Sequence, residues 1–395
     1  MIVTQAFRYE LDPTPAEAAG LARHAGAARF AHNWAVERCQ AALAAVQPLP
    51  TAAALHRDWN DWKRTNATWW CKVSKCAPQE AFRDTQRAYR NWREGRAKPP
   101  RFHRKGIRDS FRQTGSIRVL ADRIVLPRIG PVRTKESTGK FQGRILSATV
   151  RREAERWFVS LTVERDRPDP VPVVGTPVGI DLGLTAFAVL SDGECLASPR
   201  SYVRALQKLR RRSRQHARKQ LGSKNRAKSA MGLARLHYRI RCRRRDFLHK
   251  ATTNLVRTKP VVVVEDLAVR NLVRNRRMSR AISDAGWSEF RRMLEYKTAW
   301  YGSHLVVAPR SFPSSKRCSA CGKIKERLSL EERVYRCEYC GVEIDRDLNA
   351  ARNLVSLVAG SSPETANACR GTVRPDRKVG HVAVKQEAER SSTFA

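Results

Sequence analysis

The sequence lacks long apolar runs. No stretch approaches the roughly 18 apolar residues that a membrane-spanning helix needs. The opening MIVTQAFRYELDPTP also lacks the apolar core of a signal peptide. We therefore expect a cytoplasmic protein with no membrane partner. Its 395 residues, 42% of them hydrophobic, are enough for about two to four domains with buried cores.

Acidic residues are scarce as well. The chain has 77 Lys and Arg against 37 Asp and Glu, a formal net charge of +40. A surface with this excess favours a polyanionic partner. The charge is mostly arginine and is spread along the chain, whereas a membrane-surface protein would concentrate lysine on an amphipathic helix. Because arginine grips phosphates and stacks on bases, nucleic acid is the expected partner.

Four of the ten cysteines form two pairs, and the other six are scattered. Each pair has C-x-x-C spacing and is followed by glycine, and fifteen residues separate the pairs: Cys318 with Cys321, and Cys337 with Cys340. In a long intracellular chain this spacing indicates a zinc ribbon and not disulfides. Four thiolates complete a tetrahedral shell, so the predicted Zn²⁺ is structural. We place the ribbon at residues 316–341.

The first 170 residues predict one helical and one strand-rich region. Thr14-Pro15-Ala16-Glu17 has capping-box spacing with proline at the first helical position, and it opens a helical region, residues 13–95. Residues 1–12 and 96–170 predict strands, including a hairpin that turns through EAER. We expect these strands to form a small antiparallel barrel or sheet.

A basic loop follows the helical region. Two prolines end the last helix, and Arg101, Arg104 and Lys105 then surround Phe102 within PPRFHRKG. The loop could simply be solvated, but alternating basic and aromatic residues are typical of grooves that bind single-stranded nucleic acid. We select the three basic residues as candidate contacts.

Residues 200–250 hold nineteen Lys or Arg and one acid. Leu233, Leu236 and Ile240 keep helical spacing, which predicts an amphipathic helix with a basic outer face. A charge run is often only a solvated face, but repulsion within this one favours phosphate contacts. The candidate contacts here are Arg210, Arg211, Arg239 and Arg243.

Three separated acids could meet at one sheet. Asp181 lies in the predicted strand GIDLG, Glu265 ends the buried strand VVVVE, and Asp347 opens the helix LNAARNLVSLVA. Open sheets place active sites at the carboxyl ends of their strands. Clustered carboxylates can hold two Mg²⁺ ions for phosphodiester hydrolysis. Asp345 is expected to have the smaller role of capping the helix.

GIDLG, VVVVEDL, the two cysteine pairs and DRDLNAARNL, in that order, resemble the TnpB (OrfB) family. Its members are RNA-guided DNA endonucleases, related to type V CRISPR effectors and long called transposases. The resemblance implies an α/β multidomain fold, in which an RNase H-like (RuvC) nuclease domain contains the zinc ribbon. A wedge β-barrel domain with a helical recognition insert would precede it.

The same resemblance implies domain limits, roles and partners. The nuclease domain would comprise residues 171–315 and 342–356, followed by a flexible tail, residues 357–395. Asp181, Glu265 and Asp347 would be the catalytic acids that bind Mg²⁺. The partners would be a DNA target and a guide RNA from the transposon end, bound by a monomer associated with the nucleoid of a bacterial or archaeal cell.

Two other functions stay open. An unguided DNA transposase would use a similar acid triad for strand transfer at defined transposon ends, because RNase H-like folds support both chemistries. A non-catalytic nucleic-acid-binding regulator would leave the three acids as ordinary sheet and cap residues.

Overall fold

The computed structural model describes residues 1–359, except 108, 140 and 330, together with residues 385–386. The chain divides into two compact units, one containing residues 1–167 and the other beginning at Pro168. The predicted tail falls mostly outside the described residues. The last helix continues to Ala359. Within the described part, no helix has the length and apolarity needed to cross a membrane.

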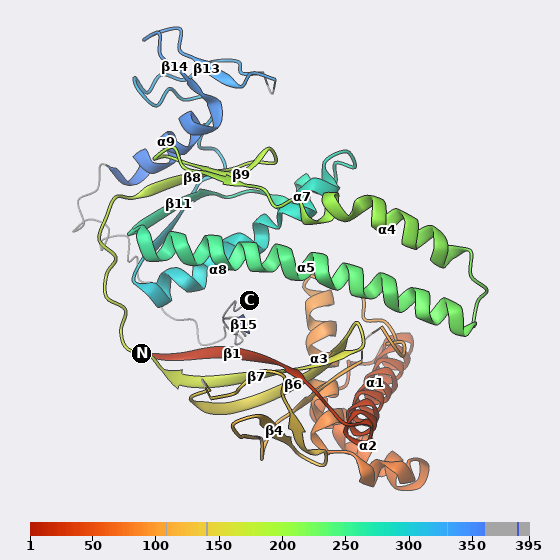
Figure 1. Ribbon diagram of the computed structural model, residues 1–395. Coiled ribbons are helices and arrows are strands. Elements are labelled where there is room, and N and C mark those ends of the chain that lie inside the picture. Colours follow the sequence, from red (N-terminus) through yellow and green to blue (C-terminus); the bar gives the residue numbers. More distant parts are fainter. Residues whose placement is uncertain (108, 140, 330, 360–384, 387–395) are drawn as a thin grey trace, which may run out of the picture. The chain divides into compact units, whose positions relative to one another are not determined.

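The first unit begins with a strand and a helical region, as predicted (Figure 1). Thr14 caps the first helix, and its hydroxyl and the Glu17 carboxylate complete the capping box. The elements are β1 (Ile2–Leu11), α1 (Pro15–Ala44), α2 (Ala52–Asn66), the 3₁₀ helix η1 (Thr68–Lys72) and α3 (Cys76–Arg93).

In the part of this unit that the structure describes, the remaining strands do not close into a barrel. They are β2 (Ser110–Gln113), β3 (Arg118–Val119), β4 (Arg123–Leu126), β5 (Gly130–Arg133), β6 (Arg144–Glu153), β7 (Arg156–Asp166) and β15 (Lys385–Gln386). Among the described residues they form an open sheet, β15-β1-β7-β6-β2, and a separate sheet, β3-β4-β5.

The barrel prediction was therefore wrong. Leu21 and Ala25 of α1, together with Ile124 and Leu126 of β4, pack against the five-stranded sheet in one core. A sheet whose apolar face is covered by helices and a second sheet has no surface left to bury by closing on itself. The hairpin of β6 and β7 through EAER was predicted correctly.

The second unit is built around a mixed sheet of order β10-β9-β8-β11-β12. β8, β9 and β10 are antiparallel neighbours, whereas β8, β11 and β12 run parallel. The valine strand β11 is an interior strand between β8 and β12 and its middle residues are buried, which confirms the burial predicted from its apolar run. The strands are β8 (Val178–Leu182), β9 (Ala186–Leu190), β10 (Cys195–Ala197), β11 (Val261–Glu265) and β12 (His304–Ala308).

Helices cover both faces of this sheet (Figure 1). The helices are α4 (Ser201–Ala217), α5 (Lys224–Thr258), α6 (Val269–Leu272), α7 (Ser279–Ala285), α8 (Trp287–Tyr301) and α9 (Arg346–Ala359). Successive side chains of β11 point to opposite faces of the sheet. Val262 and Val264 pack with α5 and α8, whereas Val263 packs with Leu354 of α9.

Gly179 lets α9 lie directly on β8. A Cβ atom at this position would be 2.1 Å from the Ala351 carbonyl oxygen and 2.7 Å from the Val355 nitrogen. Both are backbone atoms of the helix, so they cannot move aside as a flexible side chain would. Gly179, the first glycine of GIDLG, therefore sets the distance between the helix and the sheet.

We predict that Gly179→Ala lowers the free energy of unfolding by about 3 kcal/mol or more, because the helix must move away from the sheet. Thermal unfolding of the purified protein measures this. Gly26→Ala is a matched control, because the nearest atom to its new methyl is the Arg29 guanidinium, 3.8 Å away. A helical Gly→Ala change of this kind is neutral or mildly stabilising. Equal unfolding temperatures for the two variants would contradict this view of Gly179.

Candidate functional site

The sheet register places Asp181 and Glu265 on the same face. Ile180 pairs with Val264 in the parallel ladder. The next residues of the two strands, Asp181 and Glu265, therefore lie side by side. Side chains alternate across a strand. Because Ile180 and Val264 both point into the core under α5 and α8, the two acids face the side that α9 covers.

α9 brings the third acid to this face. The helix crosses β8 at Gly179, and Asp347 lies in its first turn. Asp345 accepts hydrogen bonds from the backbone nitrogens of Asp347 and Leu348, each at 2.9 Å. The predicted capping role of Asp345 is thus confirmed, and its carboxylate is engaged in starting the helix.

The electrostatics of Asp181 reflect this convergence. Burial, and after it the negative charges of Glu265 and Asp347, together raise the pKa of its carboxyl from 3.8 to about 8. The Arg346 guanidinium acts against them but is the weaker influence. A group of carboxylates that disfavours its own ionisation is a place where a cation would be stabilising. Oxygen donors of this kind suit Mg²⁺.

The three carboxylates share a face but are not gathered into a closed ligand set. Within the described residues, the cysteines are the group whose metal-binding atoms all lie within 4.8 Å of one another. Asp347 Oδ1 instead accepts from the Arg346 guanidinium at 3.3 Å, and Glu265 Oε1 accepts from the Ser314 hydroxyl. Neighbouring donors therefore hold two of the three acids.

The four predicted zinc ligands do come together. The Sγ atoms of Cys318 and Cys340 are 3.7 Å apart, and those of Cys321 and Cys337 are 3.6 Å apart. A tetrahedral Zn²⁺ with Zn–S bonds of about 2.3 Å places its sulfurs about 3.8 Å from each other. The thiols therefore fit zinc without rearrangement.

Each cysteine pair sits in a tight turn. Gly322 and Gly341 adopt left-handed φ angles of 76° and 71°, and they donate to the carbonyls of Cys318 and Cys337. The second turn lies between β13 (Val334–Arg336) and β14 (Glu343–Asp345), which pair antiparallel. Because β14 ends where α9 begins, the zinc ribbon leads directly into the helix that carries Asp347.

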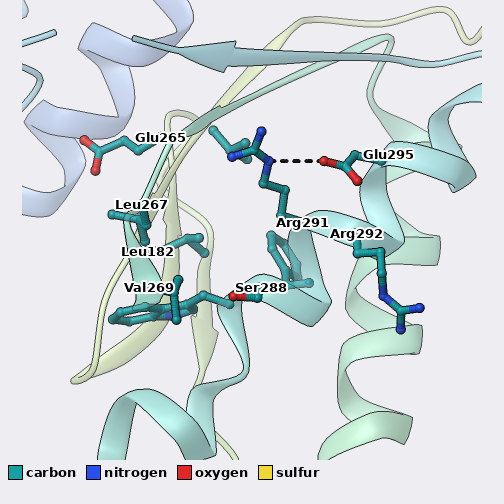
Figure 2. A pocket seen from close by; sticks show the side chains of 11 residues that line it. Leu182, Glu265, Leu267, Val269, Ser288, Arg291, Arg292 and Glu295 are labelled. Atoms are coloured by element: carbon teal, nitrogen blue, oxygen red, sulfur yellow. Dashed lines mark hydrogen bonds and ion pairs between the residues drawn. The ribbon is translucent and has the colours of Figure 1, made fainter. Parts of the chain in front are cut away.

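A cavity of about 140 Å³ lies beside Glu265, on the sheet face that α5 and α8 cover (Figure 2). Leu182, Leu267 and Val269 line one part of it, and Arg291 and Glu295 are paired at another. Figure 2 shows the Glu265 carboxylate pointing away from these apolar side chains. The cavity thus borders the acid group without receiving the carboxylate.

The seven basic residues selected from the sequence are all exposed, and none forms an ion pair within the described part of the chain: Arg101, Arg104, Lys105, Arg210, Arg211, Arg239 and Arg243. The last four lie on α4 and α5, which pack together through Leu209, Leu236 and Ile240. Their charges are therefore available to a ligand.

The basic loop of the first unit is held through its backbone. Asn33 of α1 donates to the His103 carbonyl at 3.1 Å and accepts from the His103 nitrogen at 2.7 Å. The His32 ring stacks on His103, with 3.7 Å between centroids. These contacts fix the loop while the side chains of Arg101, Arg104 and Lys105 remain exposed.

Sequence reasoning missed several polar residues around the acids. Ser314 contacts Glu265, and the buried side chains of Asn349 and Asn353 bind backbone groups of the segment that enters the ribbon. A signal for the two asparagines was present, because they are four residues apart on a helix and share one face. Nothing in the local pattern singled out Ser314.

Comparisons with known proteins agree with this architecture. The family described as "Probable transposase" (OrfB_IS605) matches residues 160–276. The "Cas12f1-like, TNB domain" matches residues 287–354, and a "Helix-turn-helix domain" of the same OrfB_IS605 group matches residues 1–47.

Similarity to curated relatives extends along almost the whole chain. A Streptomyces pristinaespiralis protein named "Putative RNA-guided DNA endonuclease" is 41% identical over 99% of this chain and 98% of its own. A Mycobacterium tuberculosis relative is 37% identical over 95% of this chain and 91% of its own. InsQ of Escherichia coli K12 is 33% identical over 89% and 92%.

The fold and the acids define a multidomain α/β protein with a zinc-ribbon-type cysteine cluster and an acidic sheet face. The chain belongs to the OrfB (TnpB) family.

The raised pKa of Asp181 predicts a pH-dependent stability. The folded state keeps a proton that the unfolded chain, with a pKa near 3.8, releases, so the free energy of unfolding falls as pH rises to about 8. In Mg²⁺-free buffer, Asp181→Asn should therefore unfold at a higher temperature than the native protein at pH 8.5. The difference should shrink toward pH 5, whereas a difference independent of pH would refute the assignment.

Loss of one cysteine should release zinc. We predict that Cys340→Ser lowers the metal content, measured by inductively coupled plasma mass spectrometry, from about one zinc per chain. The unfolding temperature should fall with it, because metal binding supplies folding free energy. Cys195→Ser is the control, since Cys195 is an equally exposed thiol outside the ribbon. Full zinc content in Cys340→Ser would show that the ribbon does not use all four thiolates.

Proposed function

We propose that this protein is an RNA-guided DNA endonuclease of a transposable element, with Asp181, Glu265 and Asp347 as the catalytic acids. The observation that carries the proposal is the convergence of β8, β11 and α9, which brings three carboxylates to one sheet face and raises the pKa of Asp181. A group of carboxylates like this can hold the metal ions that phosphodiester hydrolysis uses. Without such a function, burying these acids would cost folding free energy.

Asp181, Glu265 and Asp347 would together hold divalent metal, most suitably two Mg²⁺ ions. When bound, these ions would activate water and stabilise the leaving oxygen. The fold of the chain positions the three carboxylates. The strand register fixes Asp181 beside Glu265, and the Asp345 cap fixes where α9 begins and hence where Asp347 lies.

The basic residues would hold the nucleic acids. The selected basic residues on α4, on α5 and in the Arg101–Lys105 loop, which form no ion pair within the described residues, would provide phosphate contacts that do not read sequence. Relatives that share nearly the full length are named RNA-guided DNA endonucleases. By analogy, pairing between DNA and a guide RNA from the transposon end would supply most of the specificity, and the protein would read a short motif beside the target.

The zinc ribbon would serve as a structural module. With four cysteines around it, a Zn²⁺ ion has no open position for substrate or water. Its contribution would be to the folding of the segment between β12 and α9. The ribbon would thereby hold in place the helix that carries Asp347.

An unguided transposase is the second candidate, favoured by the "Probable transposase" description of the matching family. The two candidates differ in their need for RNA. Strand transfer at transposon ends would survive RNase treatment of the purified protein, whereas guided cleavage would be lost and would be restored by the guide.

We predict that Asp181→Ala, Glu265→Ala and Asp347→Asn each lower Mg²⁺-dependent DNA cleavage at least about 1,000-fold, since a metal ligand is lost. Binding of RNA and DNA, measured by gel shift, should persist. Asp345→Asn is the matched control next to Asp347, because asparagine caps helices as well as aspartate does. The proposal fails if Asp347→Asn and Asp345→Asn cleave DNA equally well.

A further inference from the structure

A buried serine contacts one of the proposed catalytic acids. Ser314 follows β12 in the segment that leads to the first zinc ligand, and only 4% of it is exposed. Its hydroxyl donates to Oε1 of Glu265. This bond occupies one carboxylate oxygen and leaves the other, Oε2, without a hydrogen-bond partner within the described residues.

Ser314 is itself held by α9. The Asn353 side chain, 2% exposed, donates to the Ser314 carbonyl at 2.8 Å, and the Ser314 nitrogen donates to the Phe312 carbonyl at 2.9 Å. With both of its backbone polar groups bonded, the Ser314 backbone cannot shift away from Glu265 without breaking a buried contact. Buried polar groups that lose their partners are costly, so the arrangement is rigid.

The same helix is hydrogen-bonded to the turn that contains Cys318. Asn349, which is fully buried, donates to the Arg317 carbonyl at 2.7 Å and accepts from the Ser319 nitrogen at 2.9 Å. Arg317 and Ser319 flank Cys318. The two asparagines of α9 therefore connect the zinc ribbon to Ser314, and Ser314 connects them to Glu265.

Glu265 needs such a restraint. Its side chain has three rotatable bonds, so the carboxylate can take several directions unless a hydrogen bond holds it. Without a donor on the α9 side, the carboxylate would gain freedom to turn away from the other acids. A hydrogen bond from a fixed hydroxyl to a carboxylate is charge-assisted and is about twice as strong as a neutral one.

We propose that Ser314 is a positioning residue, which fixes the Glu265 carboxylate so that its second oxygen is presented to divalent metal, and that Asn349 and Asn353 tie this placement to the zinc ribbon. The proposal rests on the function proposed above. It adds a specific role for the ribbon, which would support the geometry of the acid site as well as fold itself.

The test compares Ser314→Ala with the native protein in complex with its guide RNA. We expect the Mg²⁺ concentration for half-maximal cleavage to rise about 10-fold to 100-fold, the usual effect of losing a residue that orients a metal ligand. Mn²⁺ binding to the free protein, followed by the electron paramagnetic resonance of free Mn²⁺, should weaken by a similar factor. Ser314→Thr keeps the hydroxyl and should restore most of both.

Ser303→Ala is the matched control. Ser303 is 5% exposed, lies in the same unit, and donates its hydroxyl to the Lys259 carbonyl at 2.7 Å. It should lose stability to a degree similar to Ser314→Ala while its Mg²⁺ requirement stays unchanged. If Ser314→Ala does not fold, Ser314→Cys, which has a similar volume and a weaker donor, replaces it with the same expected direction.

The outcomes separate the two proposals. A native Mg²⁺ requirement and native Mn²⁺ affinity in Ser314→Ala would overturn the positioning role, and so would an equal rise in Ser303→Ala. Asp181→Ala is measured alongside. If that variant cleaves DNA normally, the catalytic assignment fails, whatever Ser314→Ala does.

Discussion

The close approach of α9 to β8 is the constraint on which the rest of the second unit depends. With glycine at position 179, the backbone of the helix lies directly against the strand, and Asp347 is carried to the face that holds Asp181 and Glu265. A larger side chain would separate the two elements. The same contact closes the core between α9 and β11, where Val263 meets Leu354. One missing methyl group thus determines both packing and the position of an acid.

The zinc ribbon is inserted immediately before α9, the helix that lies against β8. It connects β12 to α9, and its second strand, β14, ends at the residue that caps the helix. With metal bound to the four cysteines, a module at this position would limit how far α9 can shift along the sheet. The asparagines on α9 add buried hydrogen bonds to the entering segment. The four cysteines and the acidic face are therefore linked by one network of contacts.

Much of this could be predicted from sequence, because the signals were local or periodic. The cysteine spacing identified the cluster of four thiols, the four valines identified a buried interior strand, and the capping box at Thr14 located the start of α1. The barrel was mispredicted because closure depends on which surfaces helices and other strands cover, and residue alternation does not report this. Ser314 was missed for a related reason. Its partner is 49 residues away, and only the folded loop brings them together.

Crystals of the protein soaked in Mn²⁺ and measured at the manganese absorption edge would test the central claim most directly. The account predicts anomalous density between the carboxylates of Asp181, Glu265 and Asp347, with Glu265 contributing the oxygen that does not accept from Ser314. Manganese elsewhere on the protein, with the three carboxylates free of it at saturating concentration, would contradict the assignment of this face as the metal site.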